Sequence, residues 1–352
     1  MQKTGDMGTP ENAKAPSIVF LMPVFEDRDS VSALMADLAR SSGVERPYCV
    51  LVEDGSVRNP VQASDIAAAG ATGAVVHLVR NMGHQRAIAT GLTYIAERLP
   101  EATAVVMDAD GEDRADSVPA LLAALGEQDV DAVVAQRRRR SEPLGFRIFY
   151  ILYRLFFQLV TGRSIRFGNF CAIGPQAVRR LACMPELWLH VASSLIVSRM
   201  RIGSVPTDRG KRYFGESKMN FVSLCLHGLR SMMVFAEDVM VRVVVFCALL
   251  AVGSSTLLAL SAMLKLAGIA TPGWYSTASG ILVVILLQAG ILTFVMLMVT
   301  GAARSGVPVV MVPVDRLIAR VDFADGASPP AATGSDRSLP PAFAGTDPSG
   351  RR

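Results

Sequence analysis

Two uncharged, apolar runs near the C-terminal end limit most strongly what this chain can fold into. At a rise of 1.5 Å per residue, a helix over Val243–Leu264 is about 33 Å long, enough to cross a hydrocarbon core of about 30 Å. Thr277–Val299 is equally apolar and of similar length, and the loop between the runs contains Trp274 and Tyr275, typical interfacial aromatics. We therefore predict a transmembrane hairpin over 239–302, with spans at 243–264 and 277–299.

Basic residues around the hairpin predict its orientation. Arginines stand before the first span and after the second: Arg230, Arg242, Arg304, Arg316 and Arg320. Since cytoplasmic loops are enriched in Lys and Arg, both ends of the hairpin are expected in the cytoplasm. Residues 1–16 lack the apolar core of a secretory signal, so the N-terminal part is expected there too. This pattern predicts a multi-pass protein of the cell inner (cytoplasmic) membrane.

Composition supports a membrane protein with polar tails. Hydrophobic residues make up 51% of the 352 residues, more than is usual for a soluble enzyme. The net charge is only +4, and the basic residues cluster at a few places, which argues against a nucleic-acid partner. Residues 1–16 read as a disordered tail. Residues 303–352 read as a cytoplasmic tail, disordered after 322, where Pro, Ala, Gly, Ser and Asp dominate.

Before the hairpin, apolar runs typical of strands alternate with helical patterns. Runs of this kind recur about every thirty residues: SIVFLM, YCVLVE, AVVHLV, TAVVMD and VDAVVA. Continuous apolar strands that alternate with helices indicate a mostly parallel sheet covered on both faces. We therefore predict an α/β domain of the Rossmann type over 17–216. In such sheets, ligands bind beyond the carboxyl ends of the strands.

Polar clusters follow all five predicted strands. They lie at 23–27, 53–56, 80–84, 108–113 and 136–140. Because the carboxyl ends of parallel strands meet at one edge of a sheet, we expect these clusters to share that edge. Acidic residues, small turn residues, helix N-termini and arginines in one place suit a nucleotide diphosphate held with a metal ion.

The cluster with the most carboxylates lies in VVMDADGEDRAD, residues 105–116. It is not an EF-hand loop, which needs glycine at its sixth position and glutamate at its twelfth. Asp108 and Asp110 are spaced to hold a divalent cation together, with Glu112 as a helper. Asp113 and Asp116 are interpreted as solvated carboxylates at the start of the next helix, where they favour its positive end.

Each cluster also has a plainer explanation taken alone. The acidic cluster 108–113 could be a solvated turn, and Asp54 with Gly55 could be a strand-to-turn connection. His84 could cap a helix instead of binding a ligand. The basic run 137–140 could be a solvated face or be attracted to anionic lipid. The shared placement of the clusters at one edge favours the ligand site over these separate explanations.

Five motifs, in order along most of the chain, resemble a known family. MPVFED is similar to P-V-Y-N-E, VEDGS to V-D-D-G-S, VRNMGHQRAIATGL to R-N-x-G-x-x-x-A-x-x-x-G-L, MDADGED to M-D-A-D-L-Q-D, and RYFGESKMN to R-Y-x-G-x-S-K. These motifs resemble those of inverting family-2 glycosyltransferases with the GT-A fold. Within that family, they resemble the polyprenyl-phosphate glycosyltransferases related to dolichol-phosphate mannosyltransferase.

The resemblance implies roles for individual residues on the donor side. Asp54 would meet the base of the nucleotide, and the expected nucleotide-binding set is Pro23, Phe25, Asp27, Asp54, Asn81 and Asp108. The expected ligands of Mg²⁺ or Mn²⁺ are Asp108, Asp110 and Glu112. Asp110, Arg212 and Lys218 are the expected catalytic residues, because fixed cations stabilise the charge of a departing nucleoside diphosphate. Glu26-Asp27 stands where the family has Asn-Glu.

The acceptor side is expected near the membrane. The segment 144–160 is rich in aromatic and aliphatic residues but contains two arginines, as an interfacial helix does. A second amphipathic helix is predicted over 217–238. The alternative is that both are buried core helices. The acceptor phosphate is expected beside Arg137, Arg147 and Asn169, and Asn169 stands where the family often has an aspartate.

The resulting functional prediction is transfer of a sugar from a nucleotide sugar to a polyprenyl (undecaprenyl) phosphate. The reaction would be inverting and metal-dependent, of the hexosyltransferase class, on the cytoplasmic face, and would serve the cell envelope. A uridine nucleotide is favoured by family frequency alone. The alternatives are another lipid or hydroxyl acceptor, or a non-catalytic protein that binds nucleotide sugars. A homo-oligomer is possible.

Overall fold

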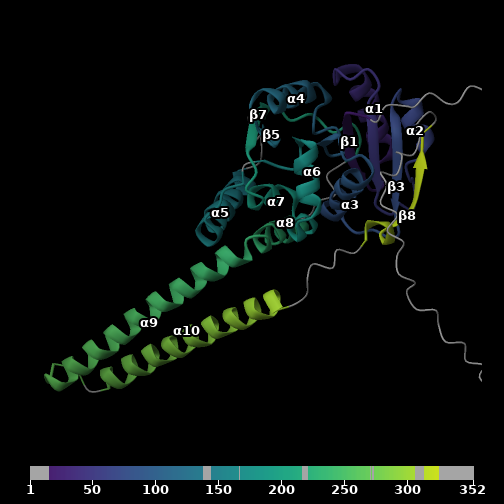
Figure 1. Ribbon diagram of the computed structural model, residues 1–352. Coiled ribbons are helices and arrows are strands. Elements are labelled where there is room, and N and C mark those ends of the chain that lie inside the picture. Colours follow the sequence, from purple (N-terminus) through teal and green to yellow (C-terminus); the bar gives the residue numbers. More distant parts are fainter. Residues whose placement is uncertain are drawn as a thin grey trace, which may run out of the picture.

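The computed structural model describes residues 16–137, 144–165, 167–215, 221–269, 271, 273–305 and 313–324. It consists of an α/β domain from which a long pair of antiparallel helices projects on one side (Figure 1). Lys218 lies outside the described residues, and for Arg137 and Arg147 only the backbone is described.

The five predicted strands are present and run in one direction. They are β1 (Ile18–Val24), β2 (Tyr48–Glu53), β3 (Thr72–Leu78), β4 (Thr103–Val106) and β5 (Ala132–Arg137). β1 pairs in parallel with β2 and β4, and β2 pairs in parallel with β3. β5 shares this direction because both it and β4 pair antiparallel with one strand between them. The prediction of a mostly parallel sheet is confirmed.

Three further strands complete the sheet and were not predicted. They are β6 (Cys171–Ile173), β7 (Ile202–Thr207) and β8 (Ile318–Phe323), and the order is β7-β5-β6-β4-β1-β2-β3-β8. β6 is too short to give a sequence pattern, and β7 contains a glycine and a proline, which are tolerated at a sheet edge. β8 follows the hairpin and pairs antiparallel with β3, within the region that the sequence assigned to a tail.

Helices cover both faces of the sheet because the strand side chains alternate between two cores. Phe20 and Met22 point into a core with α1 (Arg28–Ser41), α2 (Ala63–Ala68) and α4 (Val118–Glu127). Val19 and Leu21 point into the opposite core with α3 (His84–Arg98), α6 (Pro175–Ala182) and α7 (Val191–Val197). Three short 3₁₀ helices are η1 (Ala115–Ser117), η2 (Pro185–Trp188) and η3 (Val314–Arg316).

Three helices meet where the hairpin leaves the domain. These are α5 (Leu144–Thr161), α8 (Phe221–Met233) and the start of α9 (Ala236–Leu266). The Tyr153 hydroxyl donates to the Gly228 carbonyl at 3.3 Å, and the rings of Phe157 and Phe235 meet edge to face with centroids 5.8 Å apart. Around these contacts α5 and α8 expose large apolar side chains: Ile151, Leu155, Phe156, Leu159, Leu226, Leu229 and Met233.

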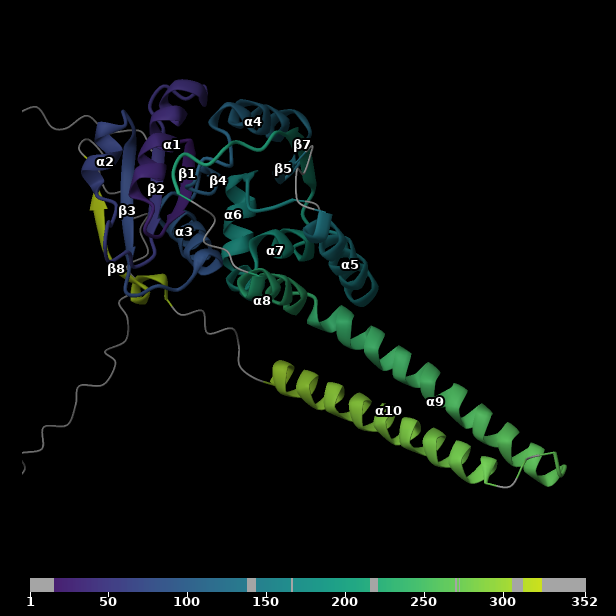
Figure 2. The ribbon, with the colours of Figure 1, turned by 180° about the vertical axis from the view of Figure 1, so that it is seen from behind.

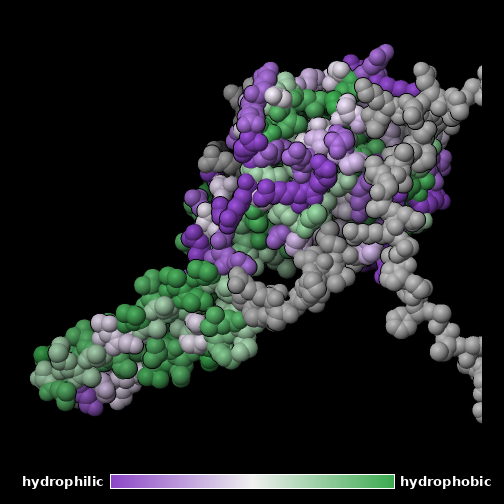
Figure 3. All heavy atoms as spheres, viewed as in Figure 1, coloured by the Kyte–Doolittle hydropathy of each residue, from purple (hydrophilic) through white to green (hydrophobic). Residues whose placement is uncertain are grey.

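The hairpin consists of α9 and α10 (Trp274–Ser305). Both helices are long and apolar enough to cross a membrane, with mean hydropathies of 2.4 and 2.7 over their most apolar windows. Only 11% and 6% of these windows are buried, so the helices are not core helices of the domain. The space-filling view shows their surface as almost continuously hydrophobic (Figure 3).

Candidate active site

The acidic turn, residues 108–113, lies directly after β4 at the carboxyl edge of the sheet. Its own side chains fix its shape. An Asp113 carboxylate oxygen, Oδ2, accepts from the Asp108 N–H at 2.9 Å, and Asp110 Oδ1 accepts from the Glu112 N–H at 2.9 Å. Gly111 makes the turn possible with a φ of 86°, a conformation that favours glycine.

The interpretation of Asp113 as a solvated carboxylate is wrong. Its residue is only 5% exposed, because its side chain folds back to bind the backbone of Asp108. Asp116 is solvated as expected, with half of its side chain exposed beside Arg114. The difference arises because a hydrogen bond to its own turn compensates Asp113 for the loss of water.

A segment about one hundred residues later closes over this turn. The Gly210 N–H donates to the Glu112 carbonyl at 2.8 Å, and the Tyr213 N–H donates to the Asp110 carbonyl at 3.1 Å. The Tyr213 ring lies so close to Gly111 that a Cβ there would approach it to 2.3 Å. The Tyr213 hydroxyl bonds to Asp37 on α1. The segment is therefore fixed by backbone and ring contacts on both sides.

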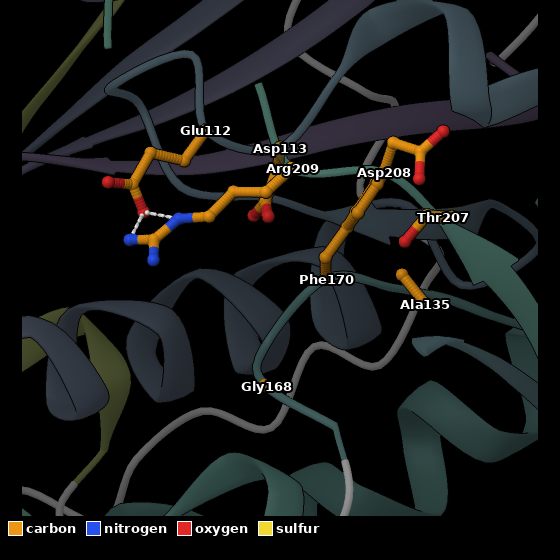
Figure 4. A pocket seen from close by; sticks show the side chains of 8 residues that line it. All are labelled: Glu112, Asp113, Ala135, Gly168, Phe170, Thr207, Asp208 and Arg209. Atoms are coloured by element: carbon orange, nitrogen blue, oxygen red, sulfur yellow. Dashed lines mark hydrogen bonds and ion pairs between the residues drawn. The ribbon is translucent and has the colours of Figure 1, made fainter. Parts of the chain in front are cut away.

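This packing brings Arg212 to the carboxylates. Its Nη2 lies 2.7 Å from Asp110 Oδ2, and its Nε lies 3.1 Å from Glu112 Oε1. Arg209 bonds to the other Glu112 oxygen (Figure 4). The predicted grouping of Asp110, Glu112 and Arg212 is thus present. Both Glu112 oxygens are bound by arginines. The role of Glu112 as a metal ligand stays a prediction, and it would require Arg209 or Arg212 to release its oxygen.

The chemistry of Asp108 and Asp110 fits a divalent cation. Burial raises the pKa of Asp110, and the neighbouring charge of Asp108 raises it further. A cation between the two carboxylates would relieve both effects. Among the described residues, no three His, Cys, Asp or Glu side chains are grouped to hold a metal ion by themselves. The pair therefore fits a cation whose remaining ligands come from a bound diphosphate or water.

His84, which the sequence analysis left open as a helix cap or a ligand, faces the acidic turn. Its Nε2 lies 3.1 Å from Asp108 Oδ1 and 3.0 Å from the Asn169 amide nitrogen. Burial opposes the charged imidazole, but the charge and hydrogen bond of Asp108, helped by Asp110 and Asp113, outweigh it and raise the pKa of His84. The helix-cap alternative is wrong, because Gly83 is the N-cap residue and no side chain caps α3.

Asn169 has two fixed partners at the start of α3. Its carbonyl oxygen accepts from the Gln85 amide at 3.2 Å, and its amide nitrogen faces His84. Gln85 is buried and also accepts from the Val191 N–H at 2.8 Å. The predicted acceptor residue Asn169 is therefore next to the acidic turn, while the side chains of Arg137 and Arg147 lie outside what the structure describes.

Asp54 joins the ends of β2 and β3. Its oxygens accept from the N–H groups of Met82 at 2.6 Å and Gly83 at 2.9 Å. Burial raises the pKa of Asp54, although these two bonds oppose the rise. The two strand ends are tightly packed, since a Cβ on Gly55 would lie 2.8 Å from the Asn81 nitrogen. A contact between Asp54 and a nucleotide base stays a prediction.

Glu26, just after β1, holds the loop at residues 57–59, a role that the sequence analysis did not predict. The Glu26 carboxylate accepts from the N–H groups of residues 57–59 at 2.8, 3.0 and 3.3 Å, and these bonds lower its pKa. Among the predicted nucleotide contacts, Pro23 lies within β1, Phe25 is 44% exposed and Asp27 is the N-cap of α1. The Glu26 departure from the family pattern thus has a structural role.

A small hollow lies behind the acidic turn. It is lined by residues of the turn, of β5, of the segment before β6 and of the end of β7 with the residues after it, including Asp113, Phe170 and Arg209 (Figure 4). Its volume is about 10 Å³. This is room for about one water molecule, too little for a nucleotide or a sugar.

Comparisons with known proteins give one family match. Residues 19–187 match the family model described as glycosyl transferase family 2. No curated protein matches the chain.

The chain is also similar to several solved structures. One is glucosyl-3-phosphoglycerate synthase from Mycobacterium tuberculosis with Mn²⁺ and UDP, at 16% identity and a TM-score of 0.45 over 65% of this chain and 80% of that chain. Mannosyl-3-phosphoglycerate synthase from Rubrobacter xylanophilus gives 16% and 0.44 over 63% and 73%. The mannosyltransferase PcManGT from Pyrobaculum calidifontis, with GDP-Man and Mn²⁺, gives 16% and 0.40 over 83% and 91%.

The matched region contains β1 to β6, the acidic turn and the Asp54 loop. Residues 19–187 therefore form a glycosyl transferase family 2 domain, within the α/β domain of the GT-A fold.

Proposed function

We propose that this enzyme transfers a sugar from a nucleotide sugar to a polyprenyl phosphate at the cytoplasmic face of a membrane. The observation that supports the acceptor most directly is the position of α8. It packs on the side of the domain where α3 begins with His84, and it leads into the hairpin (Figure 2). The acceptor side of the site thus adjoins the helices that would enter the membrane.

The donor would lie over the open side of the acidic turn. Asp108 and Asp110 would hold Mg²⁺ or Mn²⁺, which when bound would neutralise the diphosphate and stabilise it as a leaving group. Arg212 is held 2.7 Å from Asp110 and adds a fixed positive charge at the same place. Lys218 is proposed as a second cation there by its place in the motif. A preorganised cation of this kind lowers the barrier without moving a proton.

The acceptor phosphate would attack from the opposite side of the sugar. Its oxygen forms the new bond to the anomeric carbon, the bond to the diphosphate oxygen breaks, and the electron pair leaves with the nucleoside diphosphate. A phosphate monoester has a second pKa of about 6 and arrives ionised, so no protein base is required. This agrees with Asn169, which cannot accept a proton at the place where the family often has an aspartate.

The apolar surface of α9 and α10 supports membrane anchoring. Exposed apolar patches of this extent are unstable in water and mark a membrane or a protein interface. Insertion of the hairpin would also set α5 and α8, with their exposed apolar side chains, at the membrane surface.

The test is transfer by the purified full-length enzyme. The protein in detergent is incubated with a panel of radiolabelled UDP- and GDP-sugars, a divalent cation and undecaprenyl phosphate. Label that enters the organic phase, survives mild base and is released by mild acid identifies a phosphate-linked sugar. Transfer to a hydroxyl lipid but not to the phosphate would contradict the acceptor, and would leave the glycosyltransferase class untouched.

A further inference from the structure

A cleft beside the site combines two positive charges with an apolar wall. It lies between the start of α3, the end of η2 and α8, and has a volume of about 150 Å³. Arg86 and Arg230 provide the charge, and Met82, Trp188, Leu189 and Met233 provide apolar surface. The three elements are far apart in sequence, so only the folded chain creates this combination.

The two arginines lack an acidic counterpart. Neither Arg86 nor Arg230 forms an ion pair with a carboxylate anywhere in the part of the chain that the structure describes. Other arginines do, such as Arg98 with Asp315, farther along α3. Two uncompensated guanidinium groups lining one cleft favour an anion, and phosphate suits their planar, multiply donating geometry.

The cleft adjoins the acidic turn through the start of α3. Gly83 and Gln85 line it, and they flank His84, which lies 3.1 Å from Asp108. Gln85 also holds Asn169. An anion bound at Arg86 would therefore enter the site on the acceptor side, away from the arginines that hold Glu112.

Two polar contacts hold α8 in place as the outer wall. His190 Nε2 lies 3.1 Å from His227 Nε2, and the Ser193 hydroxyl lies 2.8 Å from the Ser231 hydroxyl. These pairs stand on either side of Arg230 in the α8 sequence. Because α8 then continues into α9, the same wall connects the cleft with the apolar hairpin.

We propose that this cleft binds the head of a lipid phosphate monoester, with the phosphate between Arg86 and Arg230 and the first carbons of its chain against Trp188 and Met233. The rest of the chain would follow the exposed apolar side of α8, including Leu229, toward α9. The inference rests on the proposed function and deepens it, since it places the acceptor at residues other than the expected Arg137 and Arg147.

Trp188 allows binding to be measured without turnover. The chain has two tryptophans, so Trp274→Phe leaves Trp188 as the only one. This protein in detergent is titrated with farnesyl phosphate, and a saturable change in fluorescence is expected. Farnesol and inorganic phosphate, titrated separately, should each bind at least about tenfold more weakly, because each offers only half of the interaction.

Arginine variants then locate the phosphate. Arg86→Gln and Arg230→Gln should each weaken farnesyl phosphate binding about tenfold or more, while the nucleotide-sugar KM in the transfer assay stays unchanged. Arg98→Gln, on the same helix as Arg86 but outside the cleft, is the matched control and should bind normally. Arg230→Lys keeps the charge and tests binding if the Gln variant unfolds, and a partial loss is expected because Lys lacks the planar fork.

The outcomes separate this inference from the proposed function. Normal farnesyl phosphate binding by folded Arg86→Gln and Arg230→Gln proteins would overturn the assignment of the cleft as the phosphate site, even if transfer to undecaprenyl phosphate is observed. Arginine-dependent binding without transfer from any nucleotide sugar would support the cleft and contradict the proposed reaction. Equal binding of inorganic phosphate and farnesyl phosphate would overturn the lipid assignment.

Discussion

The acidic turn and the cleft beside α3 handle charge in opposite ways. At the turn, Arg209 and Arg212 already pair with Glu112 and Asp110, so part of the negative charge is compensated within the protein. In the cleft, Arg86 and Arg230 have no such carboxylate partners in the described chain. A site built from matched charges is rigid before its ligand arrives, whereas unmatched cations depend on a ligand for their counter-charge. The two halves of the proposed reaction would thus use preorganisation to different degrees.

The largest expected effect comes from breaking the matched side. Asp110→Asn keeps an oxygen that can accept from the Glu112 N–H, but removes the negative charge that Arg212 and a metal ion require. We expect the transfer rate to fall on the order of 10²–10³-fold with little change in the midpoint of thermal unfolding. Rates are measured over a titration of Mg²⁺ and Mn²⁺.

Asp116→Asn is the control for that variant, because Asp116 is an exposed carboxylate outside the site. It should keep its activity and its dependence on metal concentration. Full activity in Asp110→Asn at saturating metal would remove Asp110 from the metal site.

A second pair of variants compares the rigidity of the two sides. Gly111 and Gly83 have nearly equal φ values, 86° and 88°, but a Cβ at Gly111 would meet the Tyr213 ring at 2.3 Å, while nothing lies within 4 Å at Gly83. Alanine at either place costs about 1–3 kcal/mol of stability from backbone strain. Gly111→Ala should lose about 1–3 kcal/mol more through the clash and should also slow transfer by displacing Arg212.

The comparison uses thermal or denaturant unfolding of both variants in the same detergent. Equal losses of stability would mean that Tyr213 moves freely, and that the turn is not held as tightly as its contacts indicate.

The smallest expected effect concerns the contact between His190 and His227, which helps to hold α8 in place. Burial, with the nearby His227 and His84, lowers the pKa of His190 from 6.5 to about 3. In the unfolded chain this imidazole takes up a proton below pH 6.5, but in the folded protein it stays neutral. Its contribution to stability is therefore present above pH 6.5 and is lost as the pH falls toward 3, by at most about 1.4 kcal/mol per pH unit.

His190→Gln should remove part of that acid sensitivity. Unfolding midpoints of the wild type and the variant are compared from pH 7.5 to pH 5, and the difference between them should shrink as the pH falls. A difference that does not vary with pH would show that the His190–His227 contact is protonated or open in the folded protein.

The sequence predicted the architecture of the sheet because its cause is local. Each of β1 to β5 is a continuous apolar run followed by a polar cluster, and parallel strands bring such clusters to one edge whatever the details. Only the resemblance indicated that Asp110 and Arg212 belong to one site, since nothing local links residues about one hundred positions apart. The cleft could not be predicted for the same reason, because its arginines lie on α3 and α8, far apart in the sequence.

Other features escaped because their signals are ambiguous in one dimension. Asp113 and Asp116 look alike in the sequence, and only the path of the turn decides that Asp113 folds inward. His84 follows a strand and starts a helix, which fits a cap or a ligand equally well. β8 resembles any short strand near a polar tail, and its partner β3 is more than two hundred residues earlier.

β8 also has a consequence for how the molecule is made. It pairs along β3, and its Asp322 carboxylate lies 3.0 Å from His77 Nε2, yet it is synthesised after both apolar helices. During translation, the edge of β3 therefore stays open until the hairpin has left the ribosome, and an open edge is where strands of different chains can pair by mistake. The domain cannot complete its sheet before both apolar helices have been synthesised, so this edge of the sheet is the last part of it to form. A truncation that ends after α10 would retain the acidic turn and the cleft, and would be expected to aggregate through β3.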